Sequence, residues 1–267
     1  MEPMVVAIGR ILLTLVVLQG LAACAAADAP VRSAARDATP APSPVASVAA
    51  VPPTPPAVRV ETVNGASSVQ AGPGAYRYSV QIPQLVGLAP HGQALDAPIR
   101  GTLQRDIDAF VSAAQEAQSP TDLTCSSQAE RVTARLAVLR VDCTASQTGV
   151  PRATTFTHTF NCDLAGTRIL ALQDLFRAGS AYLDVLSTAA RSQFPAQATP
   201  AADRTVAEGT APVAGNFKAF LLTQAALVIV FPDYEVAPGT ATAPQVSISY
   251  DDLRRYLAPG IADLLAS

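Results

Sequence analysis

Tryptophan is absent from this 267-residue chain, and lysine occurs only once, at Lys218, among 18 basic residues. The formal net charge at neutral pH is −3. Proteins that bind nucleic acid carry a broad basic surface, so this charge excludes nucleic acid as a partner. Histidine is also scarce, with only His91 and His158. Because histidine is the side chain that titrates near neutral pH, few groups are available for acid–base catalysis.

The motifs of common enzymes are missing as well. The sequence contains no G-x-S-x-G, H-E-x-x-H, P-loop or G-x-G-x-x-G pattern. It has no Cys-x-x-Cys or Cys/His ligand spacing, so we expect no metal site and no cofactor. His158 alternates with Phe156 and Phe160, as a packed residue of a strand does. A serine triad assembles in space and leaves no sequence pattern, so the sequence favours a non-enzyme and leaves a hydrolase open.

The N-terminus resembles the signal peptide of a bacterial lipoprotein. Arg10 precedes the apolar run ILLTLVVL, and small residues follow up to Cys24 in the tetrapeptide LAAC. We expect residues 1–23 to be removed as a lipoprotein signal peptide and the thiol of Cys24 to receive a diacylglycerol. The protein is then exported and anchored through Cys24 to the bilayer, on the outer face of the bacterial cell membrane. An ordinary cleaved leader and an uncleaved anchor helix are the alternatives.

A segment rich in proline and alanine follows, over residues 24–57. It has no aromatic residue and no apolar periodicity, so it cannot bury enough surface to offset its ordering entropy. As a partly extended tether it spans up to roughly 100 Å, which suits a protein that reaches through a cell wall. A low-complexity insert with no length requirement is the alternative. Residues 58–267 are long enough for a single extracytoplasmic domain.

Apolar periodicity places the first elements of this domain. Alternation predicts a strand over residues 76–82, and helical spacing predicts a helix over 95–114 with Asp96 as its N-cap. Three β segments follow near 123–132, 135–145 and 153–162, and Asp163 and Gly166 suit a tight turn.

A second amphipathic helix is expected after Ser180, and Ser180 is predicted to be its N-cap. Residues 196–212 are polar and small, as in a surface loop. The segments NFKAFLLT, ALVIVF and QVSISY read as strands, followed by a short helix, DDLRRYL, capped by Asp251. The predicted fold class is α+β: an antiparallel sheet with two main helices packed on one face and a short C-terminal helix.

Three cysteines remain if Cys24 is lipidated. Export implies an oxidising compartment, so we expect a disulfide. A hairpin that turns near residues 133–134 sets Cys125 opposite Cys143, at a separation that a disulfide accepts. Cys162 is then a buried thiol, or it pairs in place of one of the other two. The predicted bond is Cys125–Cys143.

The stretch FPDYEVAPG places Asp233, Tyr234 and Glu235 side by side after a buried strand. Two carboxylates can act as an acid–base pair in glycoside cleavage. Adjacent carboxylates of a loop are usually solvated, however, and a tyrosine at a corner usually packs with its hydroxyl bonded. We interpret the three residues as a marker of the fold and as a candidate rim of a binding site.

Several motifs together resemble a known extracytoplasmic domain family of unknown function. They are YRYSVQIPQLVGL, TFNCDLAGTRILALQDLF, FKAFLLTQAALVIVFPDYEVAPG and VSISYDDLRRYL. This family includes the lysozyme-binding domain of the anti-sigma factor RsiV, accessory domains of peptidoglycan deacetylases and mycobacterial immunogenic secreted proteins. The chain departs from the family pattern in the loop SQTGVPRATT, where a Gly-Gly-Ala-His element is common, and after Pro238.

The resemblance implies a binding domain without an active site of its own. Together with the leader and the tether, it leads us to expect a membrane-anchored envelope lipoprotein that binds a secreted protein or a cell-wall polymer such as peptidoglycan. The alternative is an envelope hydrolase, esterase-like or glycan-modifying. A scaffold for envelope assembly is a third hypothesis.

Overall fold

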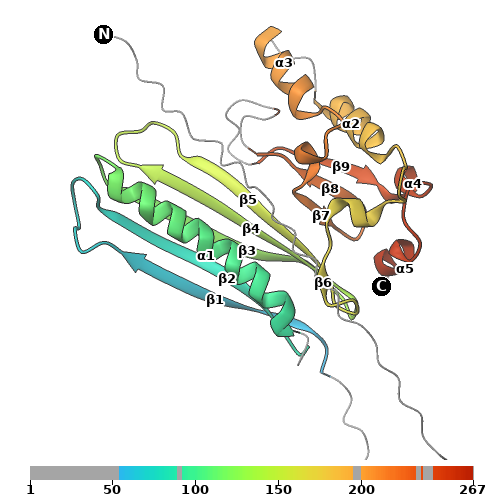
Figure 1. Cartoon of the computed structure of the whole chain (residues 1–267), viewed down its shortest axis with the longest axis horizontal. Helices are drawn as coiled ribbons and strands as arrows, with labels where there is room; N and C mark the ends of the chain where they lie inside the picture. Colours follow the sequence, from blue (N-terminus) through green and yellow to red (C-terminus); the bar gives the residue numbers. More distant parts are fainter. Residues whose placement is uncertain (1–53, 89–91, 195–199, 233–235, 237–242, 267) are drawn as a thin grey trace, which may run out of the picture. The chain divides into compact units, whose positions relative to one another are not determined.

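The computed structural model describes residues 54–88, 92–194, 200–232, 236 and 243–266 (Figure 1). The predicted signal peptide, Cys24 and the greater part of the predicted tether lie outside these residues. The candidate rim formed by Asp233, Tyr234 and Glu235 lies outside them too. No helix within the described ranges is long and apolar enough to cross a membrane.

The first half of the domain forms a six-stranded sheet in the order β1-β2-β3-β4-β5-β6. Its elements are β1 (Ala57–Ala66), β2 (Tyr76–Val86), α1 (Gly92–Glu116), β3 (Thr121–Val132), β4 (Leu136–Gln147), β5 (Thr154–Asp163) and β6 (Arg168–Ile169). Neighbouring strands are antiparallel except β2 and β3, which are parallel. A parallel pair needs a crossover connection, and α1 supplies it.

The second half forms a three-stranded antiparallel sheet in the order β7-β8-β9. Its strands are β7 (Phe220–Leu222), β8 (Ala226–Val230) and β9 (Gln245–Ser249). The helices of this half are α2 (Tyr182–Gln193), α3 (Pro200–Gly209), α4 (Tyr250–Leu253) and α5 (Ile261–Leu265), with 3-10 turns η1 (Leu172–Leu175) and η2 (Ala214–Phe217).

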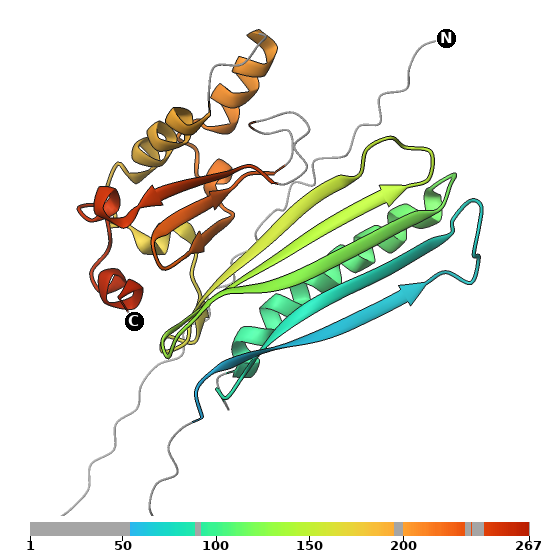
Figure 2. The same cartoon turned by 180° about the vertical axis from the view of Figure 1, so that it is seen from behind.

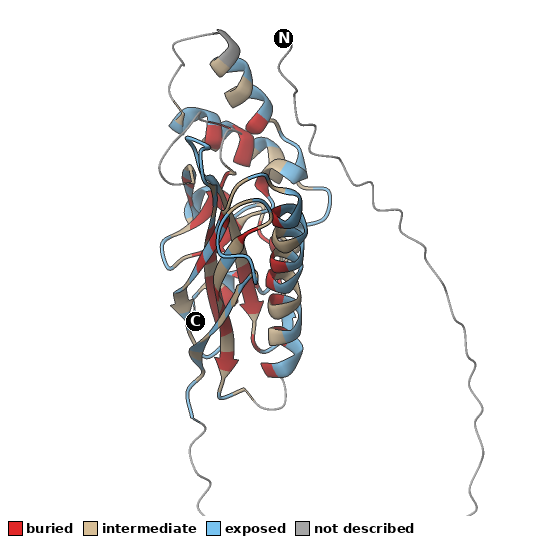
Figure 3. Ribbon diagram, turned by 90° about the vertical axis from the view of Figure 1, so that its left-hand side faces the viewer, coloured by how far each residue is buried: buried red, intermediate tan, exposed pale blue. Residues whose placement is uncertain are grey.

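The α+β class and the short C-terminal helix are therefore confirmed. The strands divide between two sheets, and each of the two long predicted helices packs on its own sheet. The inward side of α1 buries Leu95, Ile99, Leu103 and Ile107 against the six-stranded sheet. Helix α2 joins the second apolar cluster through Leu186 and Ala190. Figure 3 shows the buried residues gathered between α1 and the sheet, with the outer side of α1 exposed.

Strand β1 was not predicted, and it begins at Ala57, the last residue of the expected tether. It pairs with β2 along its whole length, from Ala57 opposite Val86 to Ala66 opposite Arg77. Glu61 holds it to the helix as well, because its carboxylate accepts hydrogen bonds from Arg100 of α1 and from Gln84. The bond from Arg100 also lowers the pKa of Glu61.

Asn161 of β5 joins the two sheets. Its side chain is 1% exposed, its Nδ2 donates to the carbonyl of Phe220 at 2.7 Å, and its Oδ1 accepts from the amide of Leu222 at 2.9 Å. The hydroxyl of Thr159 accepts from the amide of Phe220 at 3.0 Å. Side chains of the larger sheet thus supply hydrogen-bond partners for the backbone N–H and C=O groups at the β7 edge of the smaller sheet. Buried backbone groups need such partners.

The predicted helix caps were wrong. Helix α1 begins at Gly92, and Asp96 lies inside it, where its Oδ1 accepts from the backbone amide of Leu85 at 2.8 Å. Burial raises the pKa of Asp96 above its ordinary value, although this hydrogen bond opposes the shift. Helix α2 has Ala181 at its N-cap, and the hydroxyl of Ser180 is buried without a partner among the described residues.

Two further predictions for the second half need correction. Ser249 caps α4, because its hydroxyl accepts from the backbone amide of Asp251 at 3.2 Å. Residues 196–212 were expected to form a surface loop, but they contain α3. The small residues of this segment include several alanines, and alanine is a strong helix former.

Candidate functional site

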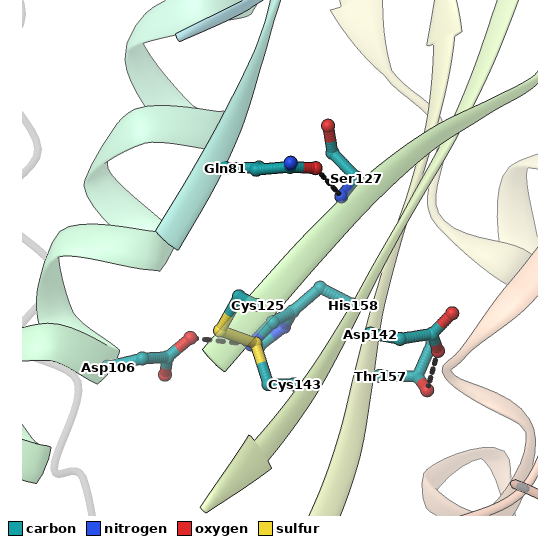
Figure 4. Close-up of a disulfide and its surroundings, with 8 residues drawn as sticks. All are labelled: Gln81, Asp106, Cys125, Ser127, Asp142, Cys143, Thr157 and His158. Carbon is teal, nitrogen blue, oxygen red and sulfur yellow. Dashed lines mark hydrogen bonds and ion pairs between the residues drawn. A yellow bond between two sulfur atoms is a disulfide. The ribbon is translucent and has the colours of Figure 1, made fainter. Parts of the chain in front are cut away.

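The predicted disulfide is confirmed: Cys125 of β3 and Cys143 of β4 are bonded and lie directly opposite each other (Figure 4). Their Cα atoms are 4.1 Å apart, near the short spacing of non-hydrogen-bonded cross-strand pairs. Both residues belong to the apolar cluster under α1. The disulfide therefore joins β3 to β4 inside the core, and it is shielded from solvent.

Cys162 is the buried thiol that the sequence left as one option. Burial raises its pKa to about 12, and the neighbouring charge of Asp96 contributes. Since the thiolate is the reactive form, Cys162 is inert at neutral pH.

His158 packs between the two phenylalanines that alternate with it in the sequence. Its ring lies edge-on to Phe156 and stacks on Phe160. Its Nε2 is 2.6 Å from Oδ2 of Asp106 on α1, as Figure 4 shows. No hydroxyl or thiol within the described ranges is hydrogen-bonded to this ring. The pair connects α1 to β5, and the sequence did not reveal Asp106 because the two residues are 52 positions apart.

Figure 2 shows the other side of the six-stranded sheet, which α1 does not cover. The strand registers and the alternation of side chains place short polar residues on it. The strand registers place one residue from each of five strands in a row across it. In strand order the row is Asn64, Ser79, Thr124, Thr144 and Thr155. Because side chains alternate along a strand, all five lie on the side opposite the disulfide and α1.

A second row lies beside the first, two residues along each strand. It consists of Thr62, Gln81, Ser126, Asp142 and Thr157. Gln81 reaches β3 through its side chain, whose Oε1 accepts from the amide of Ser127 at 2.9 Å. We call the two rows together the hydroxyl face.

The one carboxylate of the hydroxyl face is neutralised locally. Oδ2 of Asp142 accepts from Nε of Arg140 at 2.7 Å, and its Oδ1 accepts from the hydroxyl of Thr157 at 2.6 Å. In the adjoining row Arg77 lies opposite Asp122. Arg140 balances Asp142, and Arg77 balances Asp122. These four charged residues, in and beside the two rows, therefore sum to zero.

A recess of about 310 Å³ opens where the hydroxyl face meets the smaller sheet. One wall comes from β5 and from the single lysine, and the other comes from the end of β8 and from residues that precede β7 and β9. The first wall is Thr155, Phe156, Thr157, His158, Thr159 and Lys218, and the second is Ala219, Val230, Phe231, Pro232 and Ala243. A smaller hollow of about 180 Å³ adjoins it beside Arg140 and Asp142.

The sequence missed this site because it is made of exposed small residues. Threonine and serine on a strand follow the ordinary alternation of a half-solvated sheet, and only the strand registers show that they line up across five strands. The sequence pointed instead to residues 233–235, which follow Pro232 of the recess. Within the described ranges, no group of three or more His, Cys, Asp or Glu side chains is arranged to hold a metal ion.

Fold and face define an α+β domain with an open polar sheet surface. Residues 173–251 match the model of a family described as "Protein of unknown function (DUF3298)". This match supports the resemblance to a domain family of unknown function that the motifs indicated. It bears on neither the anti-sigma factor nor the deacetylases.

Two solved structures share the fold. A DUF3298 family protein from Pseudomonas aeruginosa PAO1 is 13% identical with a TM-score of 0.56, and the alignment covers 78% of this chain and 97% of that chain. A DUF3298 family member from Bacteroides fragilis NCTC 9343 is 14% identical with a TM-score of 0.56, over 79% and 98% of the two chains. No curated protein matches. At such low identity the similarity concerns the fold alone.

Proposed function

We propose that this protein is an exported lipoprotein, anchored at Cys24, whose domain binds a ligand of the bacterial envelope. The observation that supports binding is the hydroxyl face with its recess. A ligand that lies on this face meets many hydrogen-bonding groups and no assembled pair of nucleophile and base among the described residues. The leader and the proline-rich segment of the sequence support the anchoring.

The binding function is tested with the purified full chain and separated envelope fractions. Retention by at least one fraction, either isolated cell-wall sacculi or secreted proteins, is the expected outcome. The recess is tested with Ala219→Trp, which fills it and should weaken retention, and the thermal unfolding of this variant is compared with that of the wild type. Failure of the wild type to be retained by any fraction contradicts the proposal.

The anchoring is tested by mass spectrometry of the mature N-terminus. The expected product begins at Cys24 and carries the mass of a diacylglycerol on its thiol, and Cys24→Ala abolishes that mass. An unmodified N-terminus downstream of Cys24 refutes the anchor and leaves the binding proposal standing, because the two rest on different residues.

A hydrolase is the second candidate, and the pair of His158 and Asp106 favours it. The arrangement matches two members of a catalytic triad, in which an acid orients the base. A serine-directed fluorophosphonate probe decides the matter. Labelling of one serine that disappears in His158→Ala supports a hydrolase, whereas the absence of labelling is expected for a binding domain.

A further inference from the structure

We infer that the hydroxyl face binds an uncharged glycan strand that lies across β1 to β5, perpendicular to the strands. The inference rests on the proposed function and names the ligand class for it. The chemistry of the face, its charge and its length each point to this ligand.

Hydroxyl and amide groups make up the first row completely. Asn64, Ser79, Thr124, Thr144 and Thr155 each offer both a donor and an acceptor. The hydroxyl groups of a sugar need both at once. Thr124 and Thr144, at the centre of the row, are exposed and carry no side-chain hydrogen bond within the described part of the chain. These two hydroxyls are therefore free to bond a ligand.

The charges of the face suit a neutral ligand. The first row has no charged residue, and the carboxylate of Asp142 in the second row already bonds Arg140 and Thr157. Arg77 and Asp122 are opposite in register and cancel. A strongly acidic or basic polymer would have to lose hydration without gaining an opposite charge, which costs free energy.

The two rows contain no aromatic, methionine or arginine side chain, and the arginines beside them, Arg77 and Arg140, are each matched by an aspartate. Interfaces between proteins usually centre on buried aromatic, methionine or arginine side chains. In the two rows every residue is small or polar, and Val60 of the outer strand β1 is an exposed large apolar residue, at 46% exposure. The face therefore favours a glycan over a protein.

The length of the face suits a chain of several sugars. Neighbouring strands are about 4.8 Å apart, so the four gaps between five strands make the row roughly 19 Å long. At the β5 end, Thr155 and Thr157 belong both to the rows and to the wall of the recess. A strand that follows the rows thus enters the recess beside Lys218.

The test uses the purified full chain and two probes: intact peptidoglycan sacculi, and chitin, an uncharged polymer of N-acetylglucosamine that carries no stem peptides. The double variant Thr124→Val with Thr144→Val removes the two central hydroxyls while keeping β-branched side chains, which suit strands. We expect the wild type to be retained by both probes and the double variant to bind about tenfold more weakly, from the loss of two hydrogen bonds.

The matched control is Thr154→Val, the same exchange on β5 with the side chain on the α1 side of the sheet. It should bind like the wild type, and all variants should unfold at the wild-type temperature. Retention by sacculi but not by chitin overturns the glycan inference and leaves the binding function in place. Unchanged binding of the double variant also overturns it. If neither probe retains the wild type, the inference is overturned. Retention of the wild type by secreted proteins then decides whether the broader binding proposal stands.

Discussion

Single residues hold the two sheets together, and Asn161 is the clearest of them. Its amide satisfies a carbonyl and an amide group of β7, which are otherwise buried without partners. A buried polar group that loses its partner costs about 1–3 kcal/mol. The sequence did not predict this role because Asn161 lies 59 and 61 positions from its two partners, and no local pattern encodes such a contact.

Asn161→Ala is therefore expected to lower the free energy of unfolding by about 2–4 kcal/mol, since two backbone groups lose their partners. Urea denaturation measures the change. Asn64→Ala, the same exchange at an exposed strand position, is expected to stay within about 0.5 kcal/mol of the wild type. Equal stability of the two variants would show that the amide of Asn161 does not hold the sheets together.

The pH dependence of stability carries the signature of Cys162. Its pKa is about 12 in the folded state and 9.0 as the reference value, so the unfolded chain loses this proton first as pH rises. The thiol therefore stabilises the fold fully below pH 9, and that contribution falls by about 1.4 kcal/mol per pH unit above it. Burial raises the pKa of Tyr250 too, which adds a similar loss above pH 10.

Urea denaturation at pH 8, 9 and 10 measures this slope. In Cys162→Ala the loss of stability between pH 9 and 10 should be clearly smaller than in the wild type, whatever the absolute stability of the variant. The same slope in both proteins would contradict a buried, protonated thiol.

Among the elements, the β3–β4 hairpin shows where sequence is sufficient. Its turn and its two periodic strands fix the register, and the register fixes the pair Cys125 and Cys143. Elements with strong periodicity, such as α1 and β2, were predicted for the same reason. Strand β1 was not, because its valines, Val58, Val60 and Val63, do not keep a strict alternation and it directly follows a proline-rich segment. The division into two sheets depends on contacts distant in sequence.

Removing the disulfide should weaken the hairpin by a predictable amount. The bond closes a loop with a sequence separation of 18 residues, for which the loss of loop-closure entropy corresponds to about 3 kcal/mol. We expect the double variant Cys125→Ala with Cys143→Ala to unfold at lower urea concentration than the wild type. Reductant should lower the midpoint of the wild type and leave that of the double variant unchanged. If the urea midpoint of the wild type does not change after complete reduction of the disulfide, the prediction is contradicted.

At the scale of the whole molecule, the two sides of the six-stranded sheet have different roles. The side under α1 contains the disulfide, Cys162 and the apolar cluster, and it gives the domain its stability. The opposite side is polar, open and without net charge, and we assign it to the ligand. The proposed binding surface gave no sequence signal because its small polar residues follow the ordinary alternation of a half-solvated sheet.

The most direct test of this division is an NMR titration of the isotope-labelled full chain with soluble, uncharged oligomers of N-acetylglucosamine. The account predicts shifts of the backbone amide signals that follow the two rows, at Thr62, Ser79, Thr124, Thr144 and Thr157, and little change along the outer side of α1. Shifts confined to α1, or no shifts at saturating oligomer, would contradict the assignment of the hydroxyl face to a glycan.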